Sequence, residues 1–258
     1  MILKITLVAG VFLCCIHTVF AQPGKIDTDR PDQTESAVTM PKKWIQFEFG
    51  LSKQATNADE NEYQHPTLLS KYGLTKKIEL RLITTVTTIT DYSNPLIKQK
   101  ETGLSPVEVG AKIALWEEKN LLPKTTLLFH VVIPKLASKN LQANKLAQNF
   151  RFSMQHSISK VVGLSYNLGA EWDGDSNEPI WVYTFSPGFN IGEKWYSYIE
   201  AFGFISKENA PEHNIDLGFA YYVNNDFKLD LSGGFGISNA APDWYVAIGA
   251  SFRFKTGK

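Results

Sequence analysis

Residues Trp244–Phe254 read WYVAIGASFRF, and alternate residues of this stretch fall into two chemically different sets. One set is apolar from Trp244 to Phe254, whereas the other consists of small residues, Tyr245 and Arg253. A period of two is the period of a β-strand. An apolar face with aromatic ends, opposite a small or charged face, is typical of a transmembrane β-barrel strand. Because strands of soluble proteins also alternate, the prediction depends on how often the pattern recurs.

The alternation recurs along the chain in segments of roughly nine to eleven residues, the length of a tilted membrane strand. The predicted strands lie near residues 45–52, 66–74, 78–86, 107–115, 125–133, 149–156, 164–173, 181–189, 195–205, 215–223, 227–232 and 244–254. For the strands 125–133, 181–189 and 195–205, the sequence does not decide which set of alternate residues points into the barrel. We therefore predict an all-β fold, an antiparallel up-and-down transmembrane β-barrel of about twelve strands.

The connections and the tryptophans agree with a barrel. Turns alternate between short ones and longer ones, of which the longest are Ala55–His65, Thr90–Gly103 and Pro134–Ala147. Outer-membrane barrels have short periplasmic turns and long external loops. All six tryptophans lie at or near predicted strand ends, where interfacial rings gather, although Trp44 and Trp116 fall on the inward parity. A soluble β-sandwich with tryptophans in its core is the alternative.

The N-terminus has the features of a secretory signal. Lys4 precedes an apolar run from Ile5 to Ile16, and Ala21 ends a small-residue cleavage site. The run is too short to span a bilayer. We expect residues 1–21 to be a cleaved signal peptide. Lipidation at Cys14 or Cys15 is the alternative, although it lacks the small residue that should precede the cysteine.

A polar segment, residues 22–42, separates this signal from the barrel at 43–258. We call residues 22–42 the lead. It can lie in the periplasm as a strap, which we favour, or fold into the lumen as a gate that pairs with Lys112, Arg151 or Arg253. The candidate gate residues are Asp29, Arg30, Asp32 and Glu35.

Composition excludes several classes of function. Both cysteines lie in the signal, so the mature chain has no disulfide or thiolate chemistry. The chain has 26 basic and 26 acidic residues, which argues against a nucleic-acid partner. The mature histidines are scattered and lack metal-site spacing, and no serine is placed to form a hydrolase site. We expect no enzyme activity, no metal and no cofactor.

Three motifs resemble a known family. The lead residues Thr28–Ser36, the hairpin around Tyr72–Arg81 and the segment Gly103–Lys112 resemble the outer-membrane transporter family labelled "meta-pathway of phenol degradation". The resemblance covers most of the mature chain. It implies a barrel linked to the uptake of aromatic compounds, and it carries over no binding residues.

The inward parity yields two sets of candidate site residues. The first set is charged and is predicted to face the lumen: Glu48, Glu79, Arg81, Glu108, Lys112, Arg151, Glu171, Glu200, Asp216, Lys228, Asp230 and Arg253. These side chains either pair across strands and fill the barrel or line a polar conduit. The second set, a candidate aromatic ligand surface on 195–205, is Tyr196, Tyr198, Phe202 and Phe204.

We therefore expect an outer-membrane channel for passive passage of small molecules, hydrophobic or aromatic compounds among them. The alternative is a closed structural or surface-interaction barrel that binds a partner through its external loops. The expected partners are outer-membrane lipid, a small-molecule substrate that the sequence does not identify, and the barrel-assembly machinery, which would recognise the C-terminal strand ending at Phe254.

Overall fold

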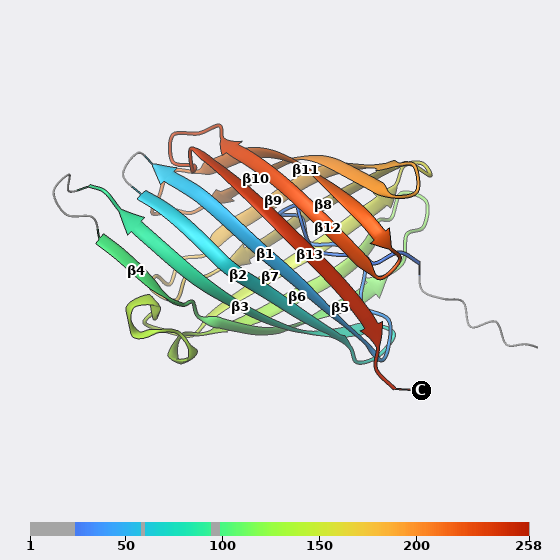
Figure 1. The fold of residues 1–258 in the computed structure, drawn as a ribbon, viewed down its shortest axis with the longest axis horizontal. Helices are drawn as coiled ribbons and strands as arrows, with labels where there is room; N and C mark the ends of the chain where they lie inside the picture. The colour runs from blue at the N-terminus through green and yellow to red at the C-terminus, as the bar shows by residue number, and fades with distance from the viewer. Residues whose placement is uncertain (1–23, 58–59, 94–98, 258) are drawn as a thin grey trace, which may run out of the picture.

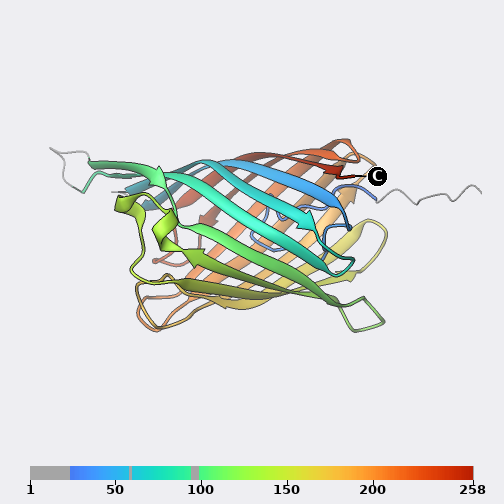
Figure 2. The same ribbon diagram turned by 90° about the horizontal axis from the view of Figure 1, so that it is seen from below.

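The computed structural model describes residues 24–57, 60–93 and 99–257 and contains one closed antiparallel sheet (Figures 1 and 2). Its strands are β1 (Trp44–Asn57), β2 (Glu60–Gly73), β3 (Ile78–Asp91), β4 (Gln99–Leu104), β5 (Val107–Trp116), β6 (Lys124–Ile133), β7 (Ala147–Ser157), β8 (Val162–Glu171), β9 (Ile180–Ile191), β10 (Trp195–Ile205), β11 (Glu212–Asn224), β12 (Phe227–Gly236) and β13 (Trp244–Lys255). The predicted signal peptide, residues 1–21, lies outside the described residues.

The sheet closes because β1 pairs with β13 as well as with β2, and β2 pairs with β3. β4 and β5 pair with successive parts of β3, so they share one position in the wall. The 13 strands therefore occupy twelve wall positions. The predicted all-β barrel is confirmed, and the soluble sandwich is excluded because a single sheet closes into a ring.

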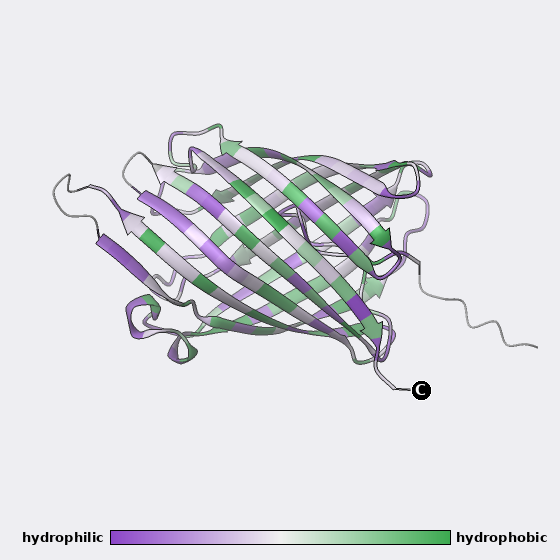
Figure 3. Cartoon of the chain, in the orientation of Figure 1, coloured by the Kyte–Doolittle hydropathy of each residue, from purple (hydrophilic) through white to green (hydrophobic). Residues whose placement is uncertain are grey.

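The predicted alternation is present along the strands (Figure 3). On β13 the side chains of Val246, Ile248 and Phe254 are exposed on the outer wall, whereas Ser251 and Arg253 are buried inside. On β10 the even-numbered residues point inward, because Tyr198, Glu200 and Phe202 are buried while Ile199 is exposed. The outer wall is thus apolar and the lumen is polar, as a lipid-facing barrel requires.

The predicted connections were longer than the real ones. Residues assigned to the loop Ala55–His65 continue β1 and β2, whose polar side chains keep pairing in register, for example Gln54 with Glu62. The predicted loop Thr90–Gly103 contains β4, bonded to the end of β3. Of the three predicted loops, the third remains a connection over residues 134–146, with short 3-10 helices at Pro134–Leu136 and Lys139–Leu141. Hydrogen bonding between neighbouring strands extends them beyond the part of the sequence with apolar alternation.

One of the two tryptophans that were predicted to point into the barrel points outward instead. Trp116 was predicted to point inward, but it is exposed because a bulge between Ala114 and Trp116 shifts the register of β5. Trp44 does lie on the inner side, with the guanidinium of Arg253 5.0 Å from its ring centroid.

Within the described residues no helix has the length and apolar character needed to cross a bilayer.

Candidate functional site in the barrel lumen

Residues 26–40 of the lead lie inside the barrel (Figure 1), which differs from the periplasmic strap that the sequence favoured. This part enters at the end of the barrel that carries the short turns, where the amide of Ile26 donates to the carbonyl of Asn225. It leaves at the same end, where the amide of Met40 donates to Glu79 and Trp44 begins β1. We call residues 26–40 the inserted segment. Many buried lumen charges need partners, and the inserted segment supplies them.

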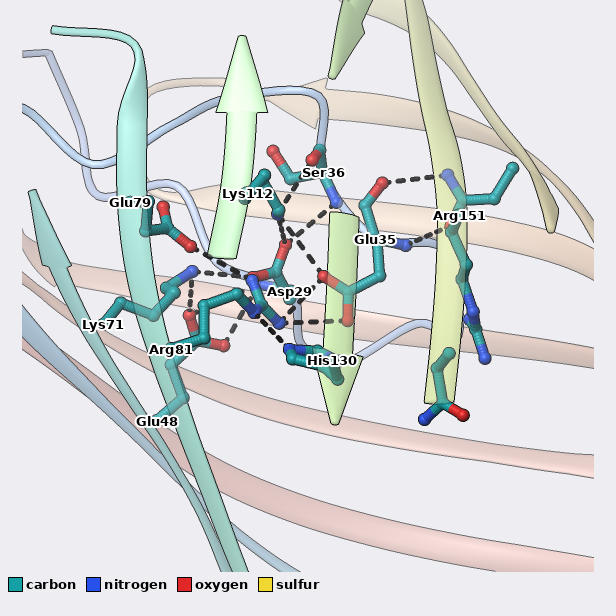
Figure 4. Close-up of polar contacts among 12 residues, drawn as sticks. Asp29, Glu35, Ser36, Glu48, Lys71, Glu79, Arg81, Lys112, His130 and Arg151 are labelled. Atoms are coloured by element: carbon teal, nitrogen blue, oxygen red, sulfur yellow. Dashed lines mark hydrogen bonds and ion pairs between the residues drawn. The ribbon is translucent and has the colours of Figure 1, made fainter. Parts of the chain in front are cut away.

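Asp29 is the centre of these contacts (Figure 4). Its carboxylate lies 2.8 Å from Lys71 Nζ, 2.7 Å from Arg81 Nη1 and 2.7 Å from Lys112 Nζ. The carboxylate is only 3% exposed, and its backbone amide donates to Glu48. Burial alone would raise the pKa of Asp29, but Lys112, Lys71 and Arg81 outweigh that effect and hold it well below the usual range. Asp29 therefore remains charged in the lumen.

Glu35 extends the same network. It lies 3.0 Å from Arg81 Nη2 and 3.3 Å from Lys112 Nζ. Arg81 also contacts Glu79 at 3.1 Å and donates to His130 Nε2. At this level the wall alone offers three cations against the two carboxylates of Glu48 and Glu79. The two carboxylates of the inserted segment more than offset that excess of one positive charge.

The opposite wall holds the next residues of the inserted segment. The amide of Gln33 donates to Glu200 Oε2 at 2.7 Å, and the hydroxyl of Thr34 bonds Glu200 and Thr184. Asn167 accepts from the amide of Glu35 and donates to its carbonyl. β3 and β10 are half-way round the ring from each other. The inserted segment thus spans the lumen from wall to wall.

Arg30 is seated on two glycines that face each other across β1 and β13. Gly50 and Gly249 are register partners, and a Cβ atom on either would collide with the Arg30 guanidinium. From this seat Arg30 Nη2 reaches Asp230 at 3.0 Å. Lys228 donates to the carbonyl of Arg30 at 2.9 Å. The glycines explain why the wall can accept a bulky side chain pressed flat against its backbone.

The charged residues predicted to face the lumen all do so. Glu48, Glu79, Arg81, Lys112, Glu200, Asp216, Lys228, Asp230 and Arg253 are buried, and Glu108, Arg151 and Glu171 are half-buried. The structure brings most of them onto the inserted segment. Arg151 donates to the carbonyl of Gln33 and also pairs with Glu171. Arg253 donates to the carbonyl of Gly24. Most of these side chains therefore bind the lead, whereas Glu108, Glu171 and Asp216 bond to other residues of the wall.

The inward aromatic residues of β10 are divided by the inserted segment. Tyr196 lines a cavity of about 180 Å³ toward the short turns. Phe202 and Phe204 line a cavity of about 640 Å³ toward the longer loops. Tyr198 is buried between them and donates to Asp216 at 3.2 Å. We call the larger space the loop-end vestibule; residues 29–33 of the inserted segment form part of its lining.

Asp32 faces both of these cavities. Burial raises the pKa of Asp32 to about 7, although Lys228 attracts its charged form. The Asp32 carboxylate accepts from Ser186 at 3.3 Å. Of the four candidate gate residues, Asp29, Arg30 and Glu35 therefore form ion pairs, whereas Asp32 titrates near neutral pH.

Sequence reasoning missed Lys71. The parity of the segment 66–74 was not assigned, so its inward lysine was not recognised. The short turn after Gly73 sets the pairing of Lys71 with Arg81 on β3, and this pairing places both on the inner face. The register of this hairpin, set by its short turn, could have shown from the sequence that Lys71 points inward.

The histidines show no catalytic pairing with a serine hydroxyl in the part of the chain that the structure describes. His213 bonds the hydroxyl of Tyr183 at 2.8 Å, and His156 lies 3.3 Å from the hydroxyl of Tyr166. Neither ring has a serine Oγ as a hydrogen-bond partner.

Comparison with known proteins supports the resemblance found in the sequence. A family model described as "Putative MetA-pathway of phenol degradation" matches residues 28–254. The chain belongs to this family. The match includes the inserted segment from Thr28 onward as well as all wall strands. No curated protein matched the chain by sequence.

Solved structures share the fold at low sequence identity. An outer membrane channel from Pseudomonas putida F1 superposes with a TM-score of 0.70 at 10% identity, covering 89% of this chain and 100% of that chain. The KdgM porin gives a TM-score of 0.55 at 9% identity, covering 81% and 99%. The NanC porin gives a TM-score of 0.50 at 10% identity, covering 81% of this chain and 98% of that chain. These similarities establish an outer-membrane barrel fold.

Proposed function

We propose that this protein is an outer-membrane channel for passive passage of small molecules, and that the inserted segment gates it. The observation that carries the proposal is the set of contacts that Asp29 makes with three buried cations of the wall. The inserted segment bonds the wall on both sides of the lumen, so a solute must displace it or pass beside it. In this account, residues 1–21 are a signal peptide, 22–42 a lumen-inserted lead and 43–258 the barrel.

The contacts of the inserted segment suit a removable element better than a permanent core. They are mostly ion pairs and hydrogen bonds, which water can replace when the segment leaves the wall. Both ends of the segment lie at the short-turn end, so it can withdraw as a loop without threading through the barrel. Cavities lie on both sides of it. A filled apolar lumen would offer none of these features.

Hydrophobic or aromatic compounds are the proposed substrates. Phe202 and Phe204 contact each other edge-to-face, with ring centroids 6.1 Å apart, on the wall of the loop-end vestibule. Aromatic rings bind well against such walls. The family description, which refers to phenol degradation, points to the same class of compound. In this account the longer loops are external, and the final strand ending at Phe254 guides assembly in the outer membrane.

Planar-bilayer recordings test this function. We expect small or rare current steps from the mature wild-type protein and larger, steady steps after deletion of residues 26–40. Deletion of residues 139–146, in the connection between β6 and β7, should leave the wild-type record unchanged. If the lead deletion yields a folded, heat-modifiable but electrically silent barrel, the channel proposal fails. The closed surface-interaction barrel would then be the better account, and its partner should require residues 139–146.

A further inference from the structure

The outer wall carries two adjoining recesses at its long-loop end, where β1, β2, β3 and β4 lie side by side (Figure 1). The first recess, of about 340 Å³, has mainly aliphatic walls, and we call it the apolar recess: Leu51, Leu231, Val246 and Ile248. The second, of about 360 Å³, is lined by hydroxyl groups, an imidazole and an amine, and we call it the polar recess: Tyr63, His65, Thr88, Thr90, Tyr92, Lys100 and Thr102. Tyr63 and His65 line both recesses, which therefore form one continuous surface.

Two lysines lie on this surface. Lys53 shares the outward parity of the exposed Leu51, and its Nζ atom lies 5.3 Å from the ring centroid of Tyr63 and 5.2 Å from that of Trp244. Lys100 on β4 lines the polar recess. In the part of the chain that the structure describes, neither lysine has a carboxylate within ion-pair distance. The surface therefore carries two positive charges without anionic partners.

The order of polar and apolar groups along the wall matches that of a membrane lipid with its headgroup at the long-loop end. Lys53 pairs in register with Val246, and Leu51 pairs with Ile248 two residues nearer to the middle of the wall. The next outward residue of β1, Phe49, is also exposed. Lysine at the membrane interface attracts anionic headgroups. A phosphate at Lys53 thus places the acyl chains of the same lipid against apolar side chains.

Neutral polar side chains separate the two lysines. One row of register partners crosses β1 to β4, namely Lys53, Tyr63, Thr88 and Thr102. Because neighbouring strands are about 4.8 Å apart, this row is about 14 Å long, and Lys100 is two residues farther along β4. The hydroxyl oxygens of Thr88 and Thr102 lie 2.8 Å apart between the two charges. The pattern suits a headgroup that has two anionic groups on a hydroxyl-bearing body.

We propose that this surface binds a phosphorylated glycolipid of the external leaflet. Its acyl chains lie in the apolar recess, one phosphate lies at Lys53 and a second at Lys100, and the sugar hydroxyls face the polar recess. The inference goes beyond the proposed channel, because the lipid stays on the outer wall and does not enter the lumen. It shares with that proposal only the assignment of the longer loops to the external side.

Lipid titration tests the proposal without any measurement of current. The probes are bisphosphorylated lipid A, monophosphorylated lipid A with the same acyl chains, and phosphatidylcholine. Each is added to the folded mature protein in detergent, and native mass spectrometry measures the fraction of barrels that hold one lipid. We expect the bisphosphorylated lipid to bind most tightly and phosphatidylcholine least tightly.

Charge variants locate the phosphates. Lys53→Gln and Lys100→Gln should each weaken binding of the bisphosphorylated lipid by about fivefold, the effect of one lysine near an anionic membrane surface. Lys160→Gln removes an exposed lysine from the turn between β7 and β8, at the other end of the barrel, and should leave the affinity unchanged.

A second pair of variants tests the apolar recess. Leu231→Trp fills the recess and should weaken binding of all three lipids, whereas Leu168→Trp, at a similarly exposed position on the outer wall of β8, should not. Heat modifiability shows that each variant is folded. Equal affinities for the three lipids, an unchanged affinity in the variant with both lysine substitutions, or equal effects of the two tryptophan substitutions would overturn the proposal. An electrically silent barrel that ranks the lipids as expected would contradict the channel alone.

Discussion

Neutralising Asp29 should release the inserted segment from the wall. In the Asp29→Asn variant, Lys71, Arg81 and Lys112 each lose a buried carboxylate at 2.7–2.8 Å. Each cation keeps another acidic neighbour, namely Glu48 for Lys71 and Glu35 for the other two. The free energy lost is therefore smaller than the sum for three independent ion pairs. Breaking a buried ion pair by removing one partner costs about 3–5 kcal/mol.

Because 1.36 kcal/mol is a tenfold change in an equilibrium, this cost shifts the docking equilibrium of the inserted segment by a factor of roughly 10² to 5 × 10³. The variant should therefore show a much higher open probability in planar bilayers. A glutamyl endopeptidase gives an independent readout, since cleavage after the partly buried Glu35 requires undocking. Mass measurement of the N-terminal fragment separates this cut from cuts in the loops.

Glu117→Gln is the matched control, because its ion pair with Lys124 at 3.4 Å is exposed and contributes about 0–1 kcal/mol. A wild-type current record in Asp29→Asn, together with undiminished protection of Glu35, would refute the reasoning. An open channel in which Glu35 stays protected would show that current bypasses the segment.

Two further predictions concern the seat of Arg30 and the pH response. Gly249→Ala places a Cβ atom against the Arg30 guanidinium, so the contact with Asp230 should be lost and open events should become more frequent. Gly163→Ala, where the nearest atom to the new Cβ is an ordinary 3.8 Å away, is the control for alanine replacement, and equal records for both variants would contradict the steric argument. Burial raises the pKa of Asp32 to about 7 in the docked state, so docking is most stable below the ordinary pKa of 3.8, loses stability as pH rises from 3.8 to about 7, and changes little above that. Open probability should therefore increase from pH 5 to pH 8 in the wild type, and Asp32→Asn should remove most of that increase.

The barrel could be predicted from the sequence because its rule is local. Lipid on one side and polar partners on the other impose a period of two, which is visible in residues such as those from Trp244 to Phe254. The same parity identified the inward charges, including Arg81 and Lys112. Strand ends were less predictable, since backbone pairing continues where side chains are polar on both faces, as it does beyond Ala55.

The position of the lead could not be predicted in the same way. Whether Asp29 meets Lys71, Arg81 and Lys112 depends on three strands that are distant in sequence, and composition indicates only that the charges are compatible. The seat for Arg30 is harder still, because it needs Gly50 and Gly249 to be register partners at one level of the wall. Such contacts require the register of the closed sheet, which single strands do not encode.

A reversible tether tests the central claim that the inserted segment gates the lumen. Thr34 and Thr184 have Oγ1 atoms 2.6 Å apart, and both cysteines of the chain lie in residues 14–15. In protein expressed without residues 1–21, Thr34→Cys with Thr184→Cys therefore introduces one disulfide. Single-channel current is recorded before and after a reductant is added, with the wild type as control. We predict a silent oxidised form that begins to conduct on reduction, while the wild type does not respond. Equal conductance of the oxidised and reduced forms would contradict the account.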